Sequence, residues 1–249
     1  MKQQLNIFFN ALSYYSRIPT PHSVRYGEQE LSQAFGYFPL VGIIVGVIGY
    51  GCWALGDALF PAPCALLMAM SAMALATGGL HEDALADLFD GFGGGRDREA
   101  ILRIMKDSCV GTYGVLALIF SIALKYGALA ALPTDVLLPV LVAAAAASRL
   151  FPVLLVRTSR YLRSTEGKAG HTRLGIDGLT LGIATLFGIT PLLYFGWLFA
   201  LVYVGLATIL LIGYRRYLHL KIGGFTGDTL GALQQFTEML FYLWAVYYI

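Results

Sequence analysis

Residues 35–58 read FGYFPLVGIIVGVIGYGCWALGDA, and this stretch decides the fold class. Its only charged residue is Asp57, close to its end. It is longer than the about 20 mostly apolar residues that a helix needs to cross the hydrocarbon core of a bilayer. Because lipid offers no partners to backbone N–H and C=O groups, a single segment that crosses it has to be helical. The stretch therefore predicts a transmembrane helix.

The rest of the chain has the same character. Of its 249 residues 57% are hydrophobic and 13% are charged, whereas a typical soluble domain carries about 25% charged residues. The mean hydropathy is +0.69. Further apolar stretches cover residues 62–80, 111–132, 135–156, 176–212 and 229–249. The run 176–212 is too long for one span and is divided near Tyr194–Gly196. We predict an all-α, polytopic membrane helical bundle of about seven transmembrane helices, forming a single catalytic domain over residues 1–249.

The N-terminal segment differs from the spans. It reads MKQQLNIFFNALSYYSRIPTP, and its apolar part is short and interrupted by polar residues. Apolar side chains recur at helical spacing, namely Leu5, Phe8, Phe9 and Leu12. This pattern predicts an amphipathic helix that lies on the membrane surface and ends before Pro19 and Pro21.

The positions of the cations predict how the bundle is oriented. With the N-terminus inside, every Lys and Arg outside the spans falls on one side, and only Lys125 and Arg149 lie within spans. Such cations gather in cytoplasmic loops. We therefore expect the N-terminus and the large polar loops at the cytoplasmic face. The net charge of +2 gives no indication of a nucleic-acid partner, and self-association into a homo-oligomer is compatible with the sequence.

An acidic stretch, TGGLHEDALADLFDGFGGG at 77–95, follows the second span. If residues 80–91 continue that span as a helix, Asp83, Asp87 and Asp90 fall within an arc of about 60°, while Glu82 and His81 point elsewhere. Three carboxylates on one stripe repel one another unless a cation lies between them. Oxygen ligands suit Mg²⁺ or Mn²⁺, and Mg²⁺ commonly adds substrate phosphates to one or two carboxylates. The stripe predicts a divalent-metal and diphosphate site, with a solvated helix end carrying surface acids as the alternative.

Other polar residues have two readings each. Asp107, in IMKDSCVGTYG at 104–114, is a fourth metal ligand or the cap of the third span. Asp228, in GGFTGDTLGA at 223–232, caps the last span or belongs to an anion-binding loop. Within that span Gln234 and Glu238 are four residues apart and are expected to face the bundle interior.

Several cations are candidates for holding phosphate. Arg149, buried within a span, needs an anionic partner, which is either Glu238 or a substrate phosphate. Arg96, Arg98 and Arg103 could also pair with phosphates, although a solvated cytoplasmic face explains them equally well. Among the histidines, His81 and His171 are candidate proton acceptors, with a structural hydrogen-bonding role as the alternative.

Several stretches, taken in order, resemble the cobalamin synthase family of adenosylcobinamide-GDP ribazoletransferases. They are RIPTP at 17–21, FPLVG at 38–42, GGLHEDALADLFDGFGGG at 78–95, ILRIMKDSCVGTYG at 101–114, SR at 148–149 and GGFTGDTLGA at 223–232. The acidic block is the specific part, and two departures are visible. The family usually has DGLAD where this chain has Ala84 at the second position, and DSR where this chain has Cys109 at the third.

The resemblance implies an enzyme of the bacterial or archaeal cytoplasmic (inner) membrane, with its active site facing the cytoplasm. A hydroxyl of α-ribazole, or of its 5′-phosphate, would attack adenosylcobinamide-GDP and release GMP, with Mg²⁺ as cofactor. Adenosylcobalamin, or its 5′-phosphate, would form. The implied roles are metal ligation by Asp83, Asp87, Asp90 and Asp107, general base catalysis by Glu82 or His81, and substrate binding by Lys106, Arg149, Asp228 and Arg96.

Two other classes of protein also place carboxylates in a membrane. CDP-alcohol phosphotransferases of phospholipid synthesis use clustered aspartates, but in them AR follows DG, an order that this chain lacks. A divalent-cation transporter would be expected to show acids near the bilayer midplane and repeated broken helices. No repeat is visible here, and Glu238 is the one acid in the middle of a predicted span.

Overall fold

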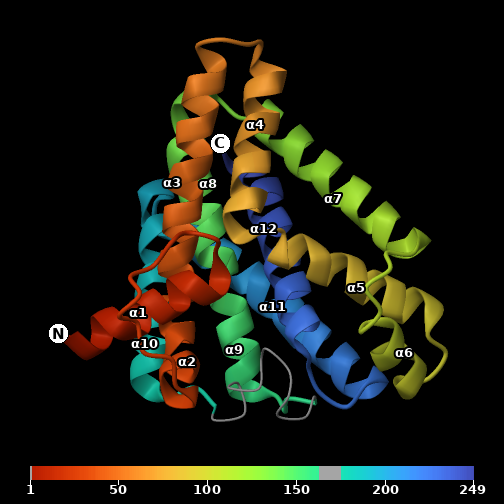
Figure 1. Cartoon of the computed structure of the whole chain (residues 1–249). Coiled ribbons are helices and arrows are strands. Elements are labelled where there is room, and N and C mark those ends of the chain that lie inside the picture. The colour runs from red at the N-terminus through yellow and green to blue at the C-terminus, as the bar shows by residue number, and fades with distance from the viewer. Residues whose placement is uncertain (1, 163–174) are drawn as a thin grey trace.

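The computed structural model describes residues 2–162 and 175–249, so the proton-acceptor candidate His171 lies outside the described residues. The described chain is a bundle of helices (Figure 1). Within it, the only β-type pairing is an isolated bridge between Tyr161 and Phe225. The predicted all-α fold is thereby confirmed.

Five helical segments are long and apolar enough to cross a membrane. Two of them are single helices, α7 (Thr112–Ala131) and α11 (Trp197–Lys221). The segment Glu28–Asp57 combines α2 (Glu28–Ala34), η1 (Phe35–Tyr37) and α3 (Phe38–Asp57), and the segment Thr134–Thr158 combines η2 (Thr134–Val136), α8 (Leu137–Ser148) and α9 (Leu150–Thr158). The segment Gly178–Phe195 combines α10 (Gly178–Ile189) and η4 (Thr190–Phe195). The break predicted near Tyr194–Gly196 is confirmed, since η4 ends at Phe195 and Gly196 has a φ of 93°.

The predicted count of seven spans is not reached among the described residues. Helices α4 (Ala62–Thr77) and α5 (Leu80–Gly94) qualify only together, as a bent pair that would make a sixth span. The last helix, α12 (Gly227–Tyr248), covers the seventh predicted span but is not among the qualifying segments. Its middle carries Gln234, Gln235 and Glu238, which lower its hydropathy.

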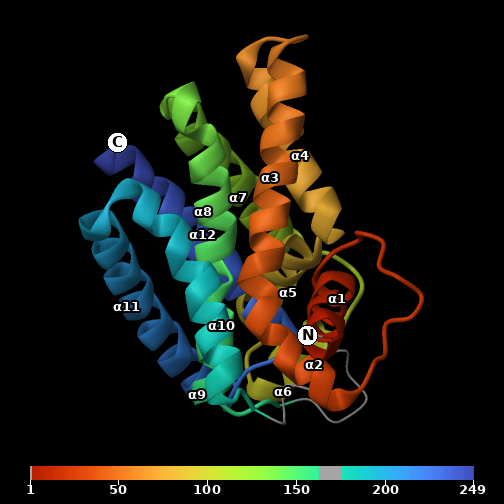
Figure 2. The same cartoon turned by 90° about the vertical axis from the view of Figure 1, so that its left-hand side faces the viewer.

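The two ends of the bundle differ as the charge pattern predicts. The α3–α4 turn, the α7–α8 turn, the α10–α11 turn and the C-terminus lie toward one end, while α2 and α6 (Arg98–Ile104) lie toward the other (Figure 2). The connections at the first end carry no Lys or Arg. The sidedness of the cations in the sequence is therefore reproduced in space.

Small residues allow the central helices to approach closely. A Cβ atom at Gly42 would lie 2.3 Å from the carbonyl oxygen of Ala145, and one at Gly46 would lie 2.7 Å from that of Leu141. The alanines 143–147 of α8 are fully buried. Lipid supplies no hydrophobic force between helices, so this close backbone packing is what holds α3 against α8.

The expectation that residues 80–91 continue the second span is wrong, although the helix itself forms as α5. Helices α4 and α5 meet at an angle of 86°. Gly78 and Gly79 both adopt left-handed φ angles, 68° and 70°, and their N–H groups donate to the carbonyls of Leu75 and Ala74. This glycine-dependent cap ends α4 and turns the chain, because other residues rarely adopt two such angles in succession.

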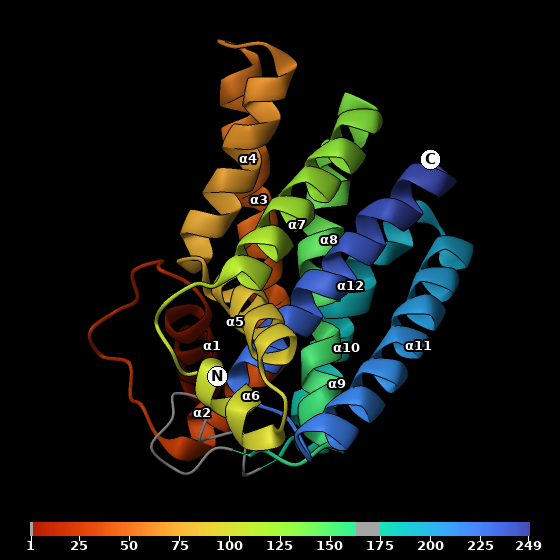
Figure 3. The same ribbon diagram turned by 90° about the vertical axis from the view of Figure 1, so that its right-hand side faces the viewer.

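Helix α5 then crosses beside α7 and α12 (Figures 1 and 3). A Cβ atom at Gly231 of α12 would lie 2.5 Å from the Cβ of Ala84, and one at Gly114 of α7 would lie 3.0 Å from the carbonyl oxygen of Ala86. The acidic helix is therefore wedged between two neighbours at glycine positions, which limits how far it can shift.

The N-terminal helix forms as expected over Lys2–Tyr15, as α1. It buries Ile7, Ala11 and Tyr15 against the bundle, and the Tyr15 ring stacks on that of Phe38 with centroids 4.1 Å apart. Leu5 is 54% exposed on another side of the helix. Its location on the membrane surface stays a prediction.

Candidate active site

A cavity of about 1100 Å³ lies beside the acidic helix. Its wall comes from the end of α1, the glycine bend, α5, and the first turn of α12. The ionisable side chains that line it within the described chain include Arg17, His81, Asp83 and Asp228. This combination brings segments from the two ends of the sequence to one place.

Two of the predicted site carboxylates face this cavity. Asp83 is exposed and Asp228 is half-buried, and both are part of the wall. Asp87 follows Asp83 by one helical turn and is half-buried. Within the described residues, no group of three or more His, Cys, Asp and Glu side chains forms a ready-made metal site. The magnesium site stays a prediction, and it would need oxygen atoms from the substrate.

Asp90 hydrogen-bonds to the backbone of a neighbouring helix. It is buried, and its two carboxylate oxygens accept hydrogen bonds from the backbone N–H groups of Gly111, at 2.6 Å, and Gly114, at 2.8 Å. Those groups belong to the N-terminus of α7, which has Gly111 as its N-cap residue and no capping side chain of its own. Asp90 therefore supplies the missing cap from a different helix, where a negative charge also favours the helix dipole.

Asp107 does not cap α7, which corrects one of its two readings. Its carboxylate accepts the backbone N–H of Cys109 at 3.1 Å, and the residue is exposed in the connection between α6 and α7. It does not line the large cavity in the described chain. Its role as a metal ligand stays a prediction.

Asp228 is likewise not the N-cap of the last helix. Thr226 holds that position, and it forms a capping box with Thr229. The hydroxyl of Thr226 also donates to Asp228 at 3.4 Å. Asp228 thus lies in the first turn, where its charge favours the dipole of α12 while its side chain reaches the cavity.

A smaller cavity, about 170 Å³, lies on another side of α5. Glu82 lines it, together with Lys125, Arg149 and Glu238, and Glu82 does not line the large cavity. His81 lines both cavities, and its Nε2 atom is buried without a hydrogen-bond partner among the described residues. Of the two candidate bases, only His81 therefore contributes to the wall of the large cavity.

Arg149 forms no hydrogen bond with Glu238 in the described chain, which corrects one of its two expected pairings, and its pairing with a substrate phosphate stays a prediction. Its Nη1 atom donates to the carbonyl of Ala145 at 2.6 Å, and the guanidinium lies over the ring of Phe38, 5.5 Å from the centroid. Glu238 instead forms an ion pair with Lys125, whose Nζ atom lies 2.7 Å from the carboxylate. As predicted, Gln234 and Glu238 are buried in the bundle.

Arg96 and Lys106 are exposed, and neither lines the large or the small cavity in the described chain. Arg96 lies two residues beyond the end of α5, and Lys106 lies in the connection that leads from α6 to α7. The structure does not bring them together with Asp83. Their role in binding substrate stays a prediction.

Two residues of the large cavity were missed from the sequence. Arg17 is its only Lys or Arg in the described chain, and a Cβ atom at Gly78 would lie 2.4 Å from the Nε atom of Arg17. The Arg17 backbone N–H donates to the carbonyl of Ala76 at 2.7 Å, which ties it to the bend. The signal was the RIPTP motif, in which Arg17 was counted only as a cytoplasmic cation.

Tyr15 is the second missed residue, since its hydroxyl is buried in the described chain without a partner and its side chain lines the large cavity. Burial raises the pKa of the Tyr15 phenol, and the nearby Tyr14 adds to this effect. Burial also raises the pKa of Tyr14, with Tyr161 contributing. Both phenols therefore stay protonated at neutral pH and can donate hydrogen bonds to a ligand.

The comparisons with known proteins decide the family. A profile described as cobalamin-5-phosphate synthase matches residues 7–246. The chain belongs to the cobalamin-5-phosphate synthase family. Members of the family in Vibrio cholerae serotype O1 and Shewanella sp. (strain W3-18-1) are named adenosylcobinamide-GDP ribazoletransferase. Each is 39% identical, over 98% and 97% of this chain, and over 94% of each relative. A third, from Shewanella pealeana, is 39% identical over 97% of this chain and 95% of its own length. No solved structure matches the chain.

The structure shows the surroundings of the two residues that depart from the usual motifs of the cobalamin-5-phosphate synthase family. Ala84 replaces a glycine, and its methyl group packs where α12 has Gly231. Cys109 replaces an arginine and is exposed in the α6–α7 connection. The first change is accommodated by the opposite glycine, and the second removes a cation from a solvent-facing position.

Proposed function

We propose that this protein joins adenosylcobinamide-GDP to α-ribazole, or to its 5′-phosphate, with release of GMP. The product is adenosylcobalamin, or its 5′-phosphate. The observation that carries the proposal is the large cavity, where carboxylates of α5 and α12 and the guanidinium of Arg17 share one wall in a member of this family. Its volume of about 1100 Å³ lies slightly above the roughly 300–1,000 Å³ that is usual for ligand pockets, which suits a bulky donor.

The reaction transfers a phosphoryl-linked group between two oxygens. The attacking hydroxyl of ribazole forms a bond to the phosphorus on the cobinamide side, and the bond from that phosphorus to the oxygen bridging to GMP breaks. GMP leaves with the electron pair, and the proton of the hydroxyl passes to a base. Because the diphosphate is anionic, catalysis depends on positioning and on neutralising charge.

We assign the predicted Mg²⁺ to Asp83 and Asp87. Mg²⁺ is commonly held by one or two carboxylates together with substrate phosphates, so two aspartates one helical turn apart fit its donor set. A bound Mg²⁺ would neutralise phosphate charge and help to orient the reacting groups. Asp90 is left with α7, and Asp107 is left out of the pair because it lies in the α6–α7 connection and not on the face of α5 that Asp83 and Asp87 share.

The remaining roles follow from which side chains face the cavity. Arg17 binds the donor diphosphate, because guanidinium groups form paired hydrogen bonds with phosphate oxygens. His81 accepts the proton from the attacking hydroxyl through its unpartnered Nε2 atom. Asp228 contacts the substrate from the first turn of α12. Arg96 and Lys106 add positive charge near the acidic helix and favour the approach of an anionic donor.

Arg149 and Glu82 receive no direct part in this chemistry, since neither lines the large cavity. We place the cavity at the cytoplasmic face of a cytoplasmic membrane, where the charge pattern puts the N-terminus. Nucleotide-activated substrates are then supplied from the cytoplasm.

The decisive experiment measures GMP release by the purified protein in lipid nanodiscs supplied with adenosylcobinamide-GDP, α-ribazole and Mg²⁺. We expect release that depends on both substrates and is abolished by a chelator and restored by added Mg²⁺. A parallel reaction with CDP-diacylglycerol as donor should release no CMP. Absence of GMP in the complete reaction, or CMP release from the second donor, would overturn the proposal.

A further inference from the structure

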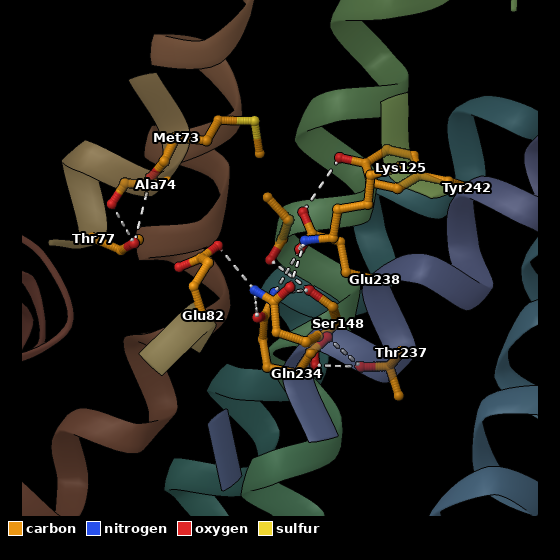
Figure 4. Close-up of polar contacts among 12 residues, drawn as sticks. Met73, Ala74, Thr77, Glu82, Lys125, Ser148, Gln234, Thr237, Glu238 and Tyr242 are labelled. Atoms are coloured by element: carbon orange, nitrogen blue, oxygen red, sulfur yellow. Dashed lines mark hydrogen bonds and ion pairs between the residues drawn. The ribbon is translucent and has the colours of Figure 1, made fainter. Parts of the chain in front are cut away.

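A polar network is buried where α7 and α12 meet. The Nζ atom of Lys125 donates to Glu238 and to the side-chain oxygen of Gln235, both at 2.7 Å. Gln234 donates to Glu238 at 3.1 Å, and the hydroxyl of Tyr242 donates to Glu238 at 3.3 Å (Figure 4). A charged pair is therefore surrounded by hydrogen bonds within an otherwise apolar bundle.

The network extends to the acidic helix through one side-chain amide. The Nε2 atom of Gln235 donates to Glu82 at 3.1 Å, while its oxygen accepts from Lys125. Glu82 comes from α5, and Figure 4 shows it reaching toward the residues of α12. Gln235, on α12, thus connects α5 and α7 through hydrogen bonds of its amide nitrogen and its amide oxygen.

A buried charged network of this kind is not expected to add much to the stability of the folded protein. Moving two charges out of water is costly, and a buried ion pair is often no more stabilising than an apolar pair of the same size. Its best-attested use is to select one packing arrangement over others. None of the network residues lines the large cavity, and Thr77 and His81 are the residues that border both cavities in the described chain.

Helix α5 is the element whose rotation about its own axis this network can fix. It is separated from α4 by the glycine bend of 86°, so the preceding span does not fix its rotation. Successive residues on a helix are about 100° apart, so the rotation that puts Glu82 on the network also puts Asp83 at the large cavity. A different rotation would turn Asp83 away from the cavity.

We propose that Glu82 is a positioning residue, which sets the rotation of α5 through Gln235 and the Lys125–Glu238 pair so that Asp83 faces the substrate cavity. Glu82 then acts as a hydrogen-bond acceptor and takes no proton from the substrate. This inference rests on the proposed function for its kinetic test, and it also has a structural test that needs no turnover.

The kinetic test compares Glu82→Gln with Glu82→Ala. The glutamine side chain keeps an oxygen for Gln235, so we expect Glu82→Gln to retain kcat within about threefold, with an unchanged pH–rate profile. Glu82→Ala and Gln235→Leu should each lower kcat by about tenfold or more and raise the Mg²⁺ concentration needed for half-maximal rate. Loss of kcat in Glu82→Gln as large as in Glu82→Ala would overturn the proposal, because a general base does not tolerate the amide.

A double-mutant cycle separates positioning from general damage. If both residues act through one contact, the combined Glu82→Ala/Gln235→Leu variant should lose no more kcat than the worse single variant. Ser121→Ala is the matched control, because Ser121 lines the same small cavity from α7 with no hydrogen bond in the described chain, and its kcat should equal that of the unaltered protein. Multiplying losses in the double variant would contradict the shared contact.

The structural test uses thiol labelling and works even if no GMP is released. The three native cysteines are replaced by serine, and Asp83→Cys is introduced as an exposed reporter on α5. Adding Gln235→Leu should change the rate of its modification by a water-soluble maleimide by about threefold or more, whereas adding Ser121→Ala should leave the rate unchanged. Equal rates in all three proteins would overturn the positioning role independently of the reaction.

Discussion

Glu82 and Asp83 are neighbours in the chain, yet their side chains face two different cavities. On one side of α5 is a wide space bordered by Asp83, Asp228 and Arg17. On the other side, Lys125 and Glu238 are already paired and hydrogen-bonded to neighbouring amides. The first cavity is large enough to admit a ligand, while the second contains a charged pair that is satisfied within the bundle.

This difference shows how an apolar bundle can use carboxylates in two ways. A carboxylate at an open cavity is free to bind a cation or a substrate, because solvent and ligand can exchange there. A carboxylate buried with a lysine instead specifies how helices pack. Four sets of variants test the distinction, in order of the expected size of the effect.

The largest effect is expected at the two proposed Mg²⁺ ligands, of which Asp83 lines the large cavity. Asp83→Asn and Asp87→Asn should each lower kcat by roughly 100-fold or more, because the substituted amide no longer neutralises phosphate charge with the metal. Membrane insertion should be unchanged. The rate of GMP release gives the measurement, and Asp135→Asn, an exposed aspartate at the opposite end of the bundle, is the control. Near-normal turnover in Asp87→Asn would reject its role as a ligand.

Substitutions at the Lys125–Glu238 pair of the small cavity should change the stability of the protein more than its catalytic rate. Lys125→Met leaves Glu238 buried without its cation, which should lower the free energy of unfolding by about 3–5 kcal/mol. Adding Glu238→Leu should restore much of that loss, because no uncompensated charge remains. Denaturant titration of the protein in detergent micelles measures both. Additive losses in the double variant would contradict an ion pair at this position.

An intermediate effect is expected at Arg17. Arg17→Ala should raise the KM for the donor by about tenfold, equivalent to roughly 1.4 kcal/mol, with a smaller change in kcat, because a phosphate contact is lost. Arg25→Ala provides the control, since Arg25 belongs to the same N-terminal region but does not line the cavity. Equal KM values for the donor in Arg17→Ala and Arg25→Ala would contradict a role of Arg17 in binding the donor.

The smallest effect is expected at Asp90. Asp90→Asn removes the negative charge at the N-terminus of α7 but keeps one acceptor oxygen, so stability should fall by about 1 kcal/mol. The Mg²⁺ concentration for half-maximal rate should not change, in contrast to Asp87→Asn. A large rise in that concentration would place Asp90 among the metal ligands after all.

Much of the fold could be predicted because a bilayer allows few solutions. Long apolar runs have to form helices there, which correctly predicted the spans over 35–58 and 111–132 and the break near Gly196. The first of these helical segments in fact begins earlier, at Glu28. The bend at Gly78–Gly79 was missed because hydropathy carries no information on φ angles. The adjacent glycines were the available signal, since they ended α4 in a left-handed cap.

The site was predictable only in part. The carboxylates of the acidic stretch stood out because their charge is unusual in an apolar chain. Their division between Asp83 at a cavity, Asp90 on the N-terminus of α7 and Glu82 on a buried amide depends on what packs against each side of α5. A helical-wheel argument places side chains around one helix, but it does not show the neighbours.

Composition and the spacing of apolar and charged residues were therefore sufficient for a helical membrane protein with its cations at one end and an acidic helix beside them. Those features depend on the free energy of single residues in lipid or water. The partner of Lys125, the place of Arg17 beside the acidic helix, and the separation of Glu82 from Asp83 were decided by tertiary packing. Each of these depends on contacts between segments distant in the sequence, which local patterns do not encode.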